Sequence, residues 1–300
     1  MRQALFVVNP TGVRHAGVLR RHCEDAARAH GWQPELVVTQ GGDASAMLHD
    51  QLRGYLEGDG EKLVFAVGGD GTVRACAHDI AGTQARLAVV PRGTANLFAG
   101  ALHLPVAVDR ALEVGFGPFE RALDLPFAGD LPFVAMAGMG LDALVVGATP
   151  EFLKSGLGWL GYAVTALPHI LAPPREVSVR LDGGEVIERR AHSVVVGNVG
   201  MLPGGFELLP GAALDDGLLE VGILSPAGVP GWARLARRVV TGHEPRGRQR
   251  PELEHFRAAL VEVVTPSAAP LQLDGDYLGS TTVLSVELHP GAMLVKVPGP

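Results

Sequence analysis

The chain has little cysteine and no excess of positive charge, and each shortage excludes a class of protein. Its 300 residues contain 2 cysteines. Cys23 and Cys76 supply neither a disulfide framework nor the ligand spacing of a zinc site. Lys and Arg number 25 against 32 Asp and Glu, so a net charge of −7 gives no field that would hold a nucleic-acid backbone. We therefore expect a cytoplasmic protein with no nucleic-acid partner.

Long apolar runs are also scarce. One segment without any Asp, Glu, Lys or Arg, residues 155–174, approaches the length that spans a bilayer. Glycines and prolines interrupt it, and no cluster of Lys or Arg marks one flank as cytoplasmic. We expect a buried helix or a lipid-facing flap here and no transmembrane segment. Some apolar side chains could line a pocket for acyl chains, although apolar positions belong more often to a core. They are Trp159, Tyr162, Leu167, Ile170, Phe206 and Trp232.

What the chain does have is ample apolar content, 47% against 19% charged residues, which indicates a globular protein. Its length favours two domains. The first part alternates short apolar runs with helix-length segments, which predicts a parallel sheet covered on both faces. The expected strands are 4–8, 36–39, 63–67 and 87–90, and the expected helices are 13–30, 43–56, 72–80 and 95–102.

From about residue 124 the chain changes to short strands separated by Gly and Pro, which predicts an antiparallel sandwich. Asp182-Gly183-Gly184 lies between two such strands, and these residue types tolerate the positive φ of a hairpin turn. The expected strands are 176–181, 185–189, 192–198, 217–224, 260–265, 271–273, 283–288 and 293–297, with one helix near 232–240.

A glycine-rich turn, Gly68-Gly69-Asp70-Gly71-Thr72, follows the strand expected at 63–67 and opens a helix. Glycines let backbone N–H groups approach phosphate oxygens, and the helix N-terminus adds the positive end of its dipole. Asp70 would repel phosphates unless it holds Mg²⁺ or a water bound to that ion. The turn therefore predicts a metal-dependent phosphate site, with a plain turn capped by an aspartate as the alternative.

A second loop, Pro91-Arg92-Gly93-Thr94-Ala95-Asn96, also follows a strand and also opens a helix. Thr39 closes a third strand. The carboxyl ends of strands form the edge of an open α/β sheet where ligands bind, so we expect these elements to face one crevice. Neither loop fits the Gly-x-x-x-x-Gly-Lys-Ser/Thr phosphate loop or the Gly-x-Gly-x-x-Gly dinucleotide pattern, which argues against both of those sites.

Together with a later Asp274-Gly275-Asp276, these two loops resemble the catalytic family of diacylglycerol kinases, including its bacterial lipid kinase branch. The resemblance covers nearly the whole chain, from Asn9-Pro10 through Asp124-Leu125 to the run that ends in Asp216-Gly217. It implies an α/β nucleotide-binding domain like that of phosphofructokinases and NAD kinases, and a β-sandwich lipid-substrate domain, with an active site between them. The implied domains are residues 1–123, rejoined by a segment at about 292–300, and residues 124–291.

The resemblance also implies roles for single residues. The family's usual Asp-Gly-Glu motif ends in the base that accepts the lipid hydroxyl proton, which places the base at Asp276 here. Because aspartate is shorter than glutamate by one methylene, Asp274 stays a candidate, and a plain hairpin turn is the alternative. Asp216 matches the place where the bacterial branch holds a structural Mg²⁺, with the carbonyls of Ala213 and Leu218; a capped turn is the alternative there. The residues implied at the nucleotide are Thr39, Gly68, Gly69, Asp70, Gly71, Thr72, Gly93 and Thr94, with Asp124 as a further organiser of metal or water.

These features lead us to expect an ATP- and Mg²⁺-dependent kinase that phosphorylates a hydroxyl of diacylglycerol or a related lipid alcohol. It would meet its lipid at the inner face of the membrane. A homodimer is compatible with the sequence. One alternative is a kinase of a soluble substrate, such as an NAD kinase. Another is a lipid-binding protein that keeps the fold without turnover, because Leu97 stands where some family members carry Asp.

Overall fold

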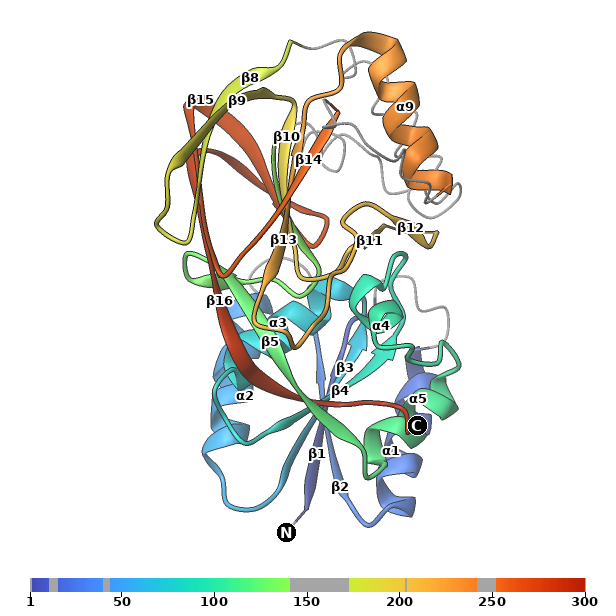
Figure 1. Ribbon diagram of the computed structural model, residues 1–300. Helices are drawn as coiled ribbons and strands as arrows, with labels where there is room; N and C mark the ends of the chain where they lie inside the picture. Colours follow the sequence, from blue (N-terminus) through green and yellow to red (C-terminus); the bar gives the residue numbers. More distant parts are fainter. Residues whose placement is uncertain are drawn as a thin grey trace. The chain divides into compact units, whose positions relative to one another are not determined.

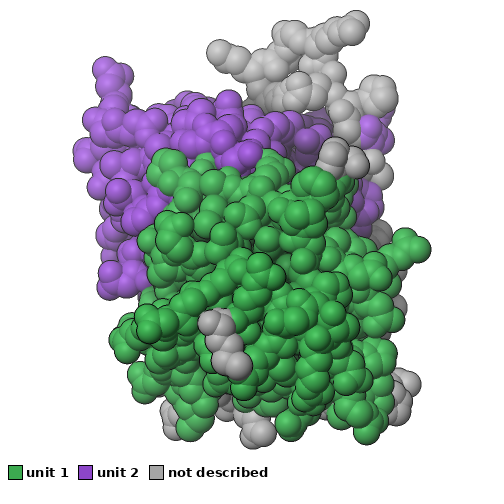
Figure 2. Space-filling view, turned by 90° about the horizontal axis from the view of Figure 1, so that it is seen from below, with its two compact units in different colours: residues 1–125, 290–300 green, residues 126–289 purple. Residues whose placement is uncertain are grey.

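The structure, a computed structural model (Figure 1), describes residues 2–10, 16–39, 44–140, 173–202, 204–241 and 252–299. The chain divides into two compact units (Figure 2). Unit 1 comprises residues 1–125 and 290–300, and unit 2 comprises residues 126–289.

Unit 1 is built on a parallel sheet whose strands lie in the order β2-β1-β3-β4. Most side chains of β1, β3 and β4 are buried, as expected of parallel strands covered on both faces. Each strand contains most of the run expected from the sequence. The bounds are β1 (Gln3–Val8), β2 (Gln33–Val38), β3 (Lys62–Gly68) and β4 (Arg86–Pro91).

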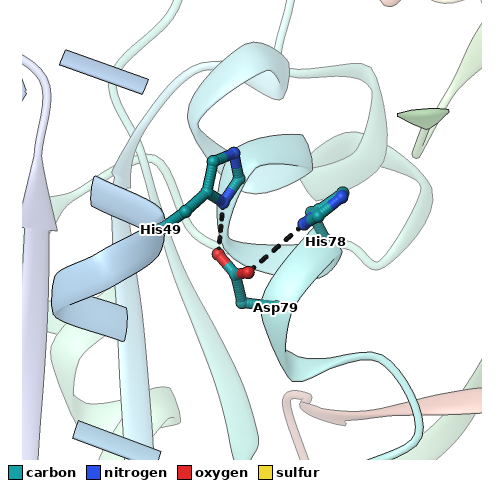
Figure 3. A group of neighbouring side chains, drawn as sticks. All are labelled: His49, His78 and Asp79. Carbon is teal, nitrogen blue, oxygen red and sulfur yellow. Dashed lines mark hydrogen bonds and ion pairs between the residues drawn. The ribbon is translucent and has the colours of Figure 1, made fainter. Parts of the chain in front are cut away.

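Helices cover both faces of this sheet (Figure 1). Helices α1 (Ala16–Ala29) and α5 (Val108–Phe116) lie on one face, and α2 (Ala44–Glu57) and α3 (Asp70–Ile80) lie on the other. The rings of Phe6 and Phe65 stack with their centroids 4.5 Å apart, in the core that packs against α1 and α5. On the opposite face His49 of α2 contacts Asp79 of α3 (Figure 3). Helix α5 was not predicted, whereas the short α4 (Leu97–Ala101) lies within a predicted helix.

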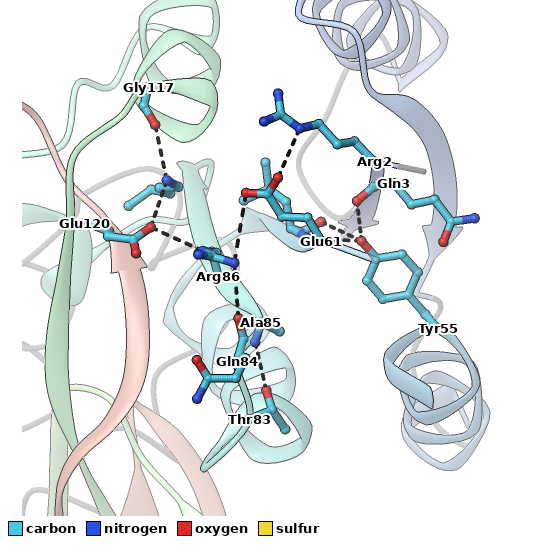
Figure 4. A network of polar contacts seen from close by, with 12 residues as sticks. Arg2, Gln3, Tyr55, Glu61, Thr83, Gln84, Ala85, Arg86, Gly117 and Glu120 are labelled. Carbon is cyan, nitrogen blue, oxygen red and sulfur yellow. Dashed lines mark hydrogen bonds and ion pairs between the residues drawn. The ribbon is translucent and has the colours of Figure 1, made fainter. Parts of the chain in front are cut away.

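The last strand, β16 (Asp276–Lys296), begins in unit 2 and ends in unit 1, where it pairs in parallel with β4. Polar contacts hold this return. Lys296 Nζ donates to Glu120 at 2.9 Å, and Glu120 in turn accepts from Arg86 at 3.3 Å. Arg86 lies at the amino end of β4, within a polar network that extends past Glu61 to Arg2 (Figure 4). This network is therefore at the amino edge of the sheet, opposite the two glycine loops.

Unit 2 is an antiparallel assembly with the strand order β14-β13-β10-β7-β15-β16, and β8 and β9 continue from β15. This confirms the predicted fold class: a parallel α/β sheet followed by an antiparallel strand domain. The elements are β6 (Leu131–Pro132), β7 (Met136–Gly140), β8 (Arg175–Leu181), β9 (Val186–Ala191), β10 (Ser193–Gly197), β11 (Met201–Leu202), β12 (Phe206–Glu207), β13 (Leu219–Leu224), α9 (Gly228–Thr241), β14 (Leu253–Ala258) and β15 (Leu260–Leu273), while β5 (Glu120–Ala128) crosses from unit 1.

Two details of the strand prediction were wrong. The runs at 260–265 and 271–273 belong to one strand, β15, and those at 283–288 and 293–297 belong to one 21-residue strand, β16. The sequence suggested breaks because Pro270, Pro290 and Gly291 interrupt the apolar alternation. Register shifts absorb the irregularity near Pro270.

Residues 155–172 of the uncharged segment lie outside the described residues. The expectation of a buried helix or flap there, and the pocket residues Trp159, Tyr162, Leu167 and Ile170, fall in this part. Trp232 packs partly buried against the core formed around Leu209 and Leu253. Among the helices that the structure describes, none is both long enough and apolar enough to cross a membrane.

Candidate functional site

The carboxyl ends of the four parallel strands meet at one edge of unit 1. Val8 of β1 is in register with Val38 of β2 and with Val67 of β3, which is in register with Val90 of β4. The next residues along the chain, Asn9, Thr39, Gly68 and Pro91, therefore lie along this edge. The strand order reverses direction between β1 and β3, which is the topological switch point where open α/β sheets bind ligands.

At this edge the two glycine loops touch each other. A Cβ added at Gly93 would lie 2.5 Å from the Cα of Gly69, and one added at Gly68 would lie 2.2 Å from Thr72 Oγ1. The N–H of Arg92 donates to the carbonyl of Gly68 at 2.8 Å. The sequence predicted that these glycines allow phosphate oxygens to approach the backbone. In the structure, Gly68 also leaves room for the Thr72 side chain, and Gly93 leaves room for the backbone of Gly69.

Asn96 closes the second loop. Its Oδ1 accepts the N–H of Gly93 at 2.8 Å, and its Nδ2 donates to the carbonyl of the same residue at 2.8 Å. The Asn96 backbone is left-handed, with φ of 49°, which asparagine tolerates better than most residues. Residues 92–95, including Thr94, are exposed above this closure. The loop therefore presents residues 92–95 to solvent from a fixed base.

Asp70 joins the two loops. Its Oδ2 accepts the N–H of Leu97 and its Oδ1 accepts the N–H of Phe98, both at 3.0 Å, so the carboxylate caps α4. The residue is 8% exposed. Burial raises the pKa of the Asp70 carboxyl above its ordinary value, and the two amides act in the opposite direction. Both oxygens thus hold the second loop, and the metal or water contact that the sequence suggested for Asp70 stays a prediction.

We predict that Gly93→Ala raises the nucleotide KM by about tenfold or more, because the added methyl collides with the Gly69 backbone and must move one loop. Steady-state kinetics with varied ATP measure it. Gly100→Ala is the matched control, since Gly100 lies a few residues further on in α4 and its added Cβ meets nothing within 4 Å. An unchanged KM in Gly93→Ala would contradict this account of the loops.

The other residues implied at the nucleotide are placed as follows. Thr39 continues the sheet ladder, because its N–H donates to the carbonyl of Val8 at 2.9 Å and its hydroxyl lies 3.4 Å from the same oxygen. Thr72 is buried in the first turn of α3, and Gly71 is half-buried beside it. Asp124 is buried and accepts the N–H of Gly291 at 2.8 Å, which ties β5 to the returning β16.

In unit 2, Asp274 and Gly275 form the two-residue turn that joins β15 to β16, with φ of 50° and 85°. Two successive positive φ values are those of a type I′ hairpin turn. The Asp274 carboxylate accepts three backbone N–H groups, from Val134 at 3.0 Å, Ala135 at 2.7 Å and Met136 at 3.1 Å. Asp276, two residues later, is exposed. The two carboxylates therefore differ: Asp274 holds the hairpin to the start of β7, and Asp276 is accessible.

We predict that Asp274→Asn lowers the free energy of unfolding by about 1–3 kcal/mol, because an amide group replaces an acceptor among three backbone donors. Asp182→Asn is the matched control variant for the turn. Asp182 also has φ of 50° before a glycine, and its Oδ1 accepts the N–H groups of Ala259 and Leu260. Denaturant melts should show a smaller loss for Asp182→Asn; equal stability of Asp274→Asn and wild type would refute the anchoring role.

The structural Mg²⁺ expected at Asp216 does not fit the side chains around it. Asp216 Oδ1 accepts the N–H of Leu218 at 3.1 Å, and Oδ2 pairs with the guanidinium of Arg257. Arg257 also donates to Glu220 at 2.8 Å. A guanidinium in contact with the carboxylate already supplies the positive charge and would repel a divalent ion. Asp216 is here an ion-pair partner in the turn before β13, and we derive no metal role from it.

Reasoning from the sequence missed three partners of the site: Asn96 as the loop closure, Gly291 as the donor to Asp124, and Arg257 as the partner of Asp216. Asn96 carried a usable signal, because asparagine at the end of a glycine loop favours a left-handed residue. The other two pairs are 167 and 41 residues apart in the sequence, and their contacts depend on the tertiary fold.

Comparisons with known proteins cover both units. Residues 3–125 match the diacylglycerol kinase catalytic domain, and residues 135–297 match the YegS C-terminal NAD kinase beta sandwich-like domain. A "probable lipid kinase YegS-like" from Pseudomonas fluorescens is 32% identical over 301 residues, covering 99% of this chain and 96% of the relative. One from Pseudomonas savastanoi is 32% identical over 281 residues, covering 90% of this chain and 86% of the relative.

Solved structures share the fold. A diacylglycerol kinase from Bacillus anthracis has a TM-score of 0.78 at 22% identity and covers 99% of this chain and 97% of its own. An NAD kinase from Archaeoglobus fulgidus in complex with ATP has a TM-score of 0.53 at 14% identity, covering 98% of this chain and 93% of its own. With two family models and full-length relatives in agreement, the chain belongs to the diacylglycerol kinase family, in its YegS-like lipid kinase branch, and is a kinase.

Proposed function

We propose that this kinase transfers the γ-phosphate of ATP to a hydroxyl of diacylglycerol or a related lipid alcohol. The observation that carries the proposal is the pair of interlocked glycine loops at the switch point of the unit 1 sheet, held together by Asp70. Such an edge offers backbone N–H groups at fixed positions, and phosphoryl transfer depends mostly on positioning and on charge stabilisation. The names of the full-length relatives support a lipid as the acceptor.

In this proposal the exposed residues Thr94 and Ala95 of the second loop and the turn at Gly69 receive the phosphates, because the N–H groups of Arg92 and Gly93 already donate to Gly68 and Asn96. Arg92 is exposed in that loop, and its guanidinium would add positive charge beside them. Mg²⁺ bound to ATP would neutralise charge on the β- and γ-phosphates. Asp276 is the proposed base, because it is the accessible carboxylate of the Asp-Gly-Asp turn while Asp274 is engaged by three amides.

The acceptor also sets where the enzyme works. A lipid alcohol with two acyl chains stays in a bilayer, so the kinase must act at a membrane surface. We propose the cytoplasmic face, where ATP is available. Flotation with vesicles that contain diacylglycerol measures this association; protein that stays in the bottom fraction under conditions of turnover would contradict it.

The decisive experiment is a transfer assay with ATP labelled at the γ-phosphate, run over a total lipid extract and over purified lipid alcohols, with NAD⁺ in a parallel reaction. The labelled product is identified by mass. We expect label in a lipid and none in NAD⁺, and Asp276→Asn serves as the enzyme-dependent blank. Label in NAD⁺ alone would indicate a soluble-substrate kinase, and lipid binding without any transfer would indicate a non-catalytic lipid-binding protein.

A further inference from the structure

A cluster of two histidines and one aspartate lies between α2 and α3, away from the glycine loops. His49 comes from α2, and His78 and Asp79 come from the C-terminal end of α3. His49 Nδ1 lies 2.5 Å from Asp79 Oδ2, and His78 Nδ1 lies 3.3 Å from Asp79 Oδ1. Figure 3 shows both rings turning a nitrogen toward the same carboxylate. We propose that these three residues bind a divalent transition metal ion, Zn²⁺ by ligand type, which links α2 to α3.

The donor set suits such an ion. Two imidazole nitrogens and one carboxylate oxygen are ligands that Zn²⁺ takes at about 2.0–2.2 Å, usually in tetrahedral geometry. Tetrahedral bonds of that length separate neighbouring ligand atoms by roughly 3.4 Å. The three ligand atoms here all lie within 4.8 Å of one another, so small side-chain rotations bring them to that separation. In the part of the chain that the structure describes, this is the one group of His, Cys, Asp and Glu with such spacing.

Burial and charge favour a cation at this place. The Asp79 side chain is 2% exposed, whereas the side chains of His49 and His78 are 25% and 30% exposed. A buried carboxylate needs a compensating positive charge, and the half-buried rings leave a path for an ion from solvent. Arg53 Nε lies 3.7 Å from Asp79 Oδ1, beyond hydrogen-bond distance, and its side chain is 64% exposed, so it does not occupy the carboxylate as Arg257 does at Asp216. A divalent ion held by both rings would supply the charge directly.

The position on α3 defines what the ion would do. The same helix begins at Asp70, the residue that joins the two glycine loops. A metal bound at the other end would fix α3 against α2 and stabilise unit 1. All three ligands belong to unit 1, and metal binding can be measured whichever lipid is the acceptor and whichever carboxylate is the base.

The test uses the full-length chain after removal of metal with a chelator. Co²⁺, whose visible absorption reports coordination by nitrogen and oxygen, is titrated first, and Zn²⁺ binding is then measured by calorimetry. We expect one equivalent to bind, and a saturating excess of Zn²⁺ to raise Tm by about 5 °C. His49→Asn and His78→Asn, which retain polar side chains of smaller size, should each weaken binding at least tenfold.

His22→Ala is the matched control, because His22 Nδ1 lies 3.2 Å from Asp109 in another His and Asp pair. This variant should bind Co²⁺ and Zn²⁺ as the wild type does. Absence of a stoichiometric Co²⁺ spectrum in the wild type would overturn the proposal. Equal affinity in wild type, His49→Asn and His78→Asn would also overturn it, and circular dichroism shows that each variant is folded before it is compared.

Discussion

Asp276→Asn is expected to lower kcat for lipid phosphorylation by about 10² to 10⁴, the usual contribution of a positioned general base. Asparagine keeps the size of the side chain and removes its capacity to take the hydroxyl proton. Nucleotide affinity should stay near the wild-type value, because the glycine loops are not altered. The experiment measures kcat with saturating lipid and the Kd for ATP by direct titration. The free energy of unfolding should be nearly unchanged, because Asp276 is exposed.

Two variants make this result specific. Asp276→Glu restores the residue usual in the family motif and should keep activity or raise it. Glu287→Gln removes an exposed carboxylate further along β16 and should be indistinguishable from wild type. If Asp274→Asn were inactive at full stability while Asp276→Asn were active, the base would be Asp274 and the assignment would be wrong.

Asp70→Asn is the second substitution with a large expected effect. An asparagine has one acceptor oxygen and one NH₂ group, so it can accept one of the two N–H groups of Leu97 and Phe98 and must set a donor against the other. An unsatisfied buried donor costs about 1–3 kcal/mol. The second loop would lose its fixed position, and we expect transfer to fall by about 10²-fold, since small misplacements have effects of that size.

The measurements are kcat/KM for ATP and the free energy of unfolding from denaturant melts. Asp59→Asn is the control, because Asp59 is an exposed aspartate in the same unit. Loss of activity without any loss of stability would favour a direct metal or water contact for Asp70, as the sequence suggested. Near-normal activity and stability would remove Asp70 from the site altogether.

The Asp-Gly-Asp turn illustrates how far a motif reaches. Its residue types predict a tight turn, and the structure has one, with positive φ at Asp274 and Gly275. The residue types alone treat the two carboxylates alike, because both are short acidic side chains two positions apart, and only the family resemblance favoured Asp276. The structure separates them through Val134, Ala135 and Met136, whose N–H groups surround Asp274. Those donors are 138 to 140 residues away in the sequence, beyond what a local pattern contains.

Local chemistry alone determined the fold class, the parallel strands of unit 1, the hairpin at Asp182 and the positions of both glycine loops. Apolar periodicity and turn residues act over a few positions, and this is the range that a sequence pattern reports. The tertiary structure decided what the candidate site residues contact: Gly93 packs against Gly69, Asp70 caps α4, and Arg257 pairs with Asp216. These outcomes depend on register between strands and on which backbone amides a buried carboxylate reaches, and both arise only when distant segments pack together.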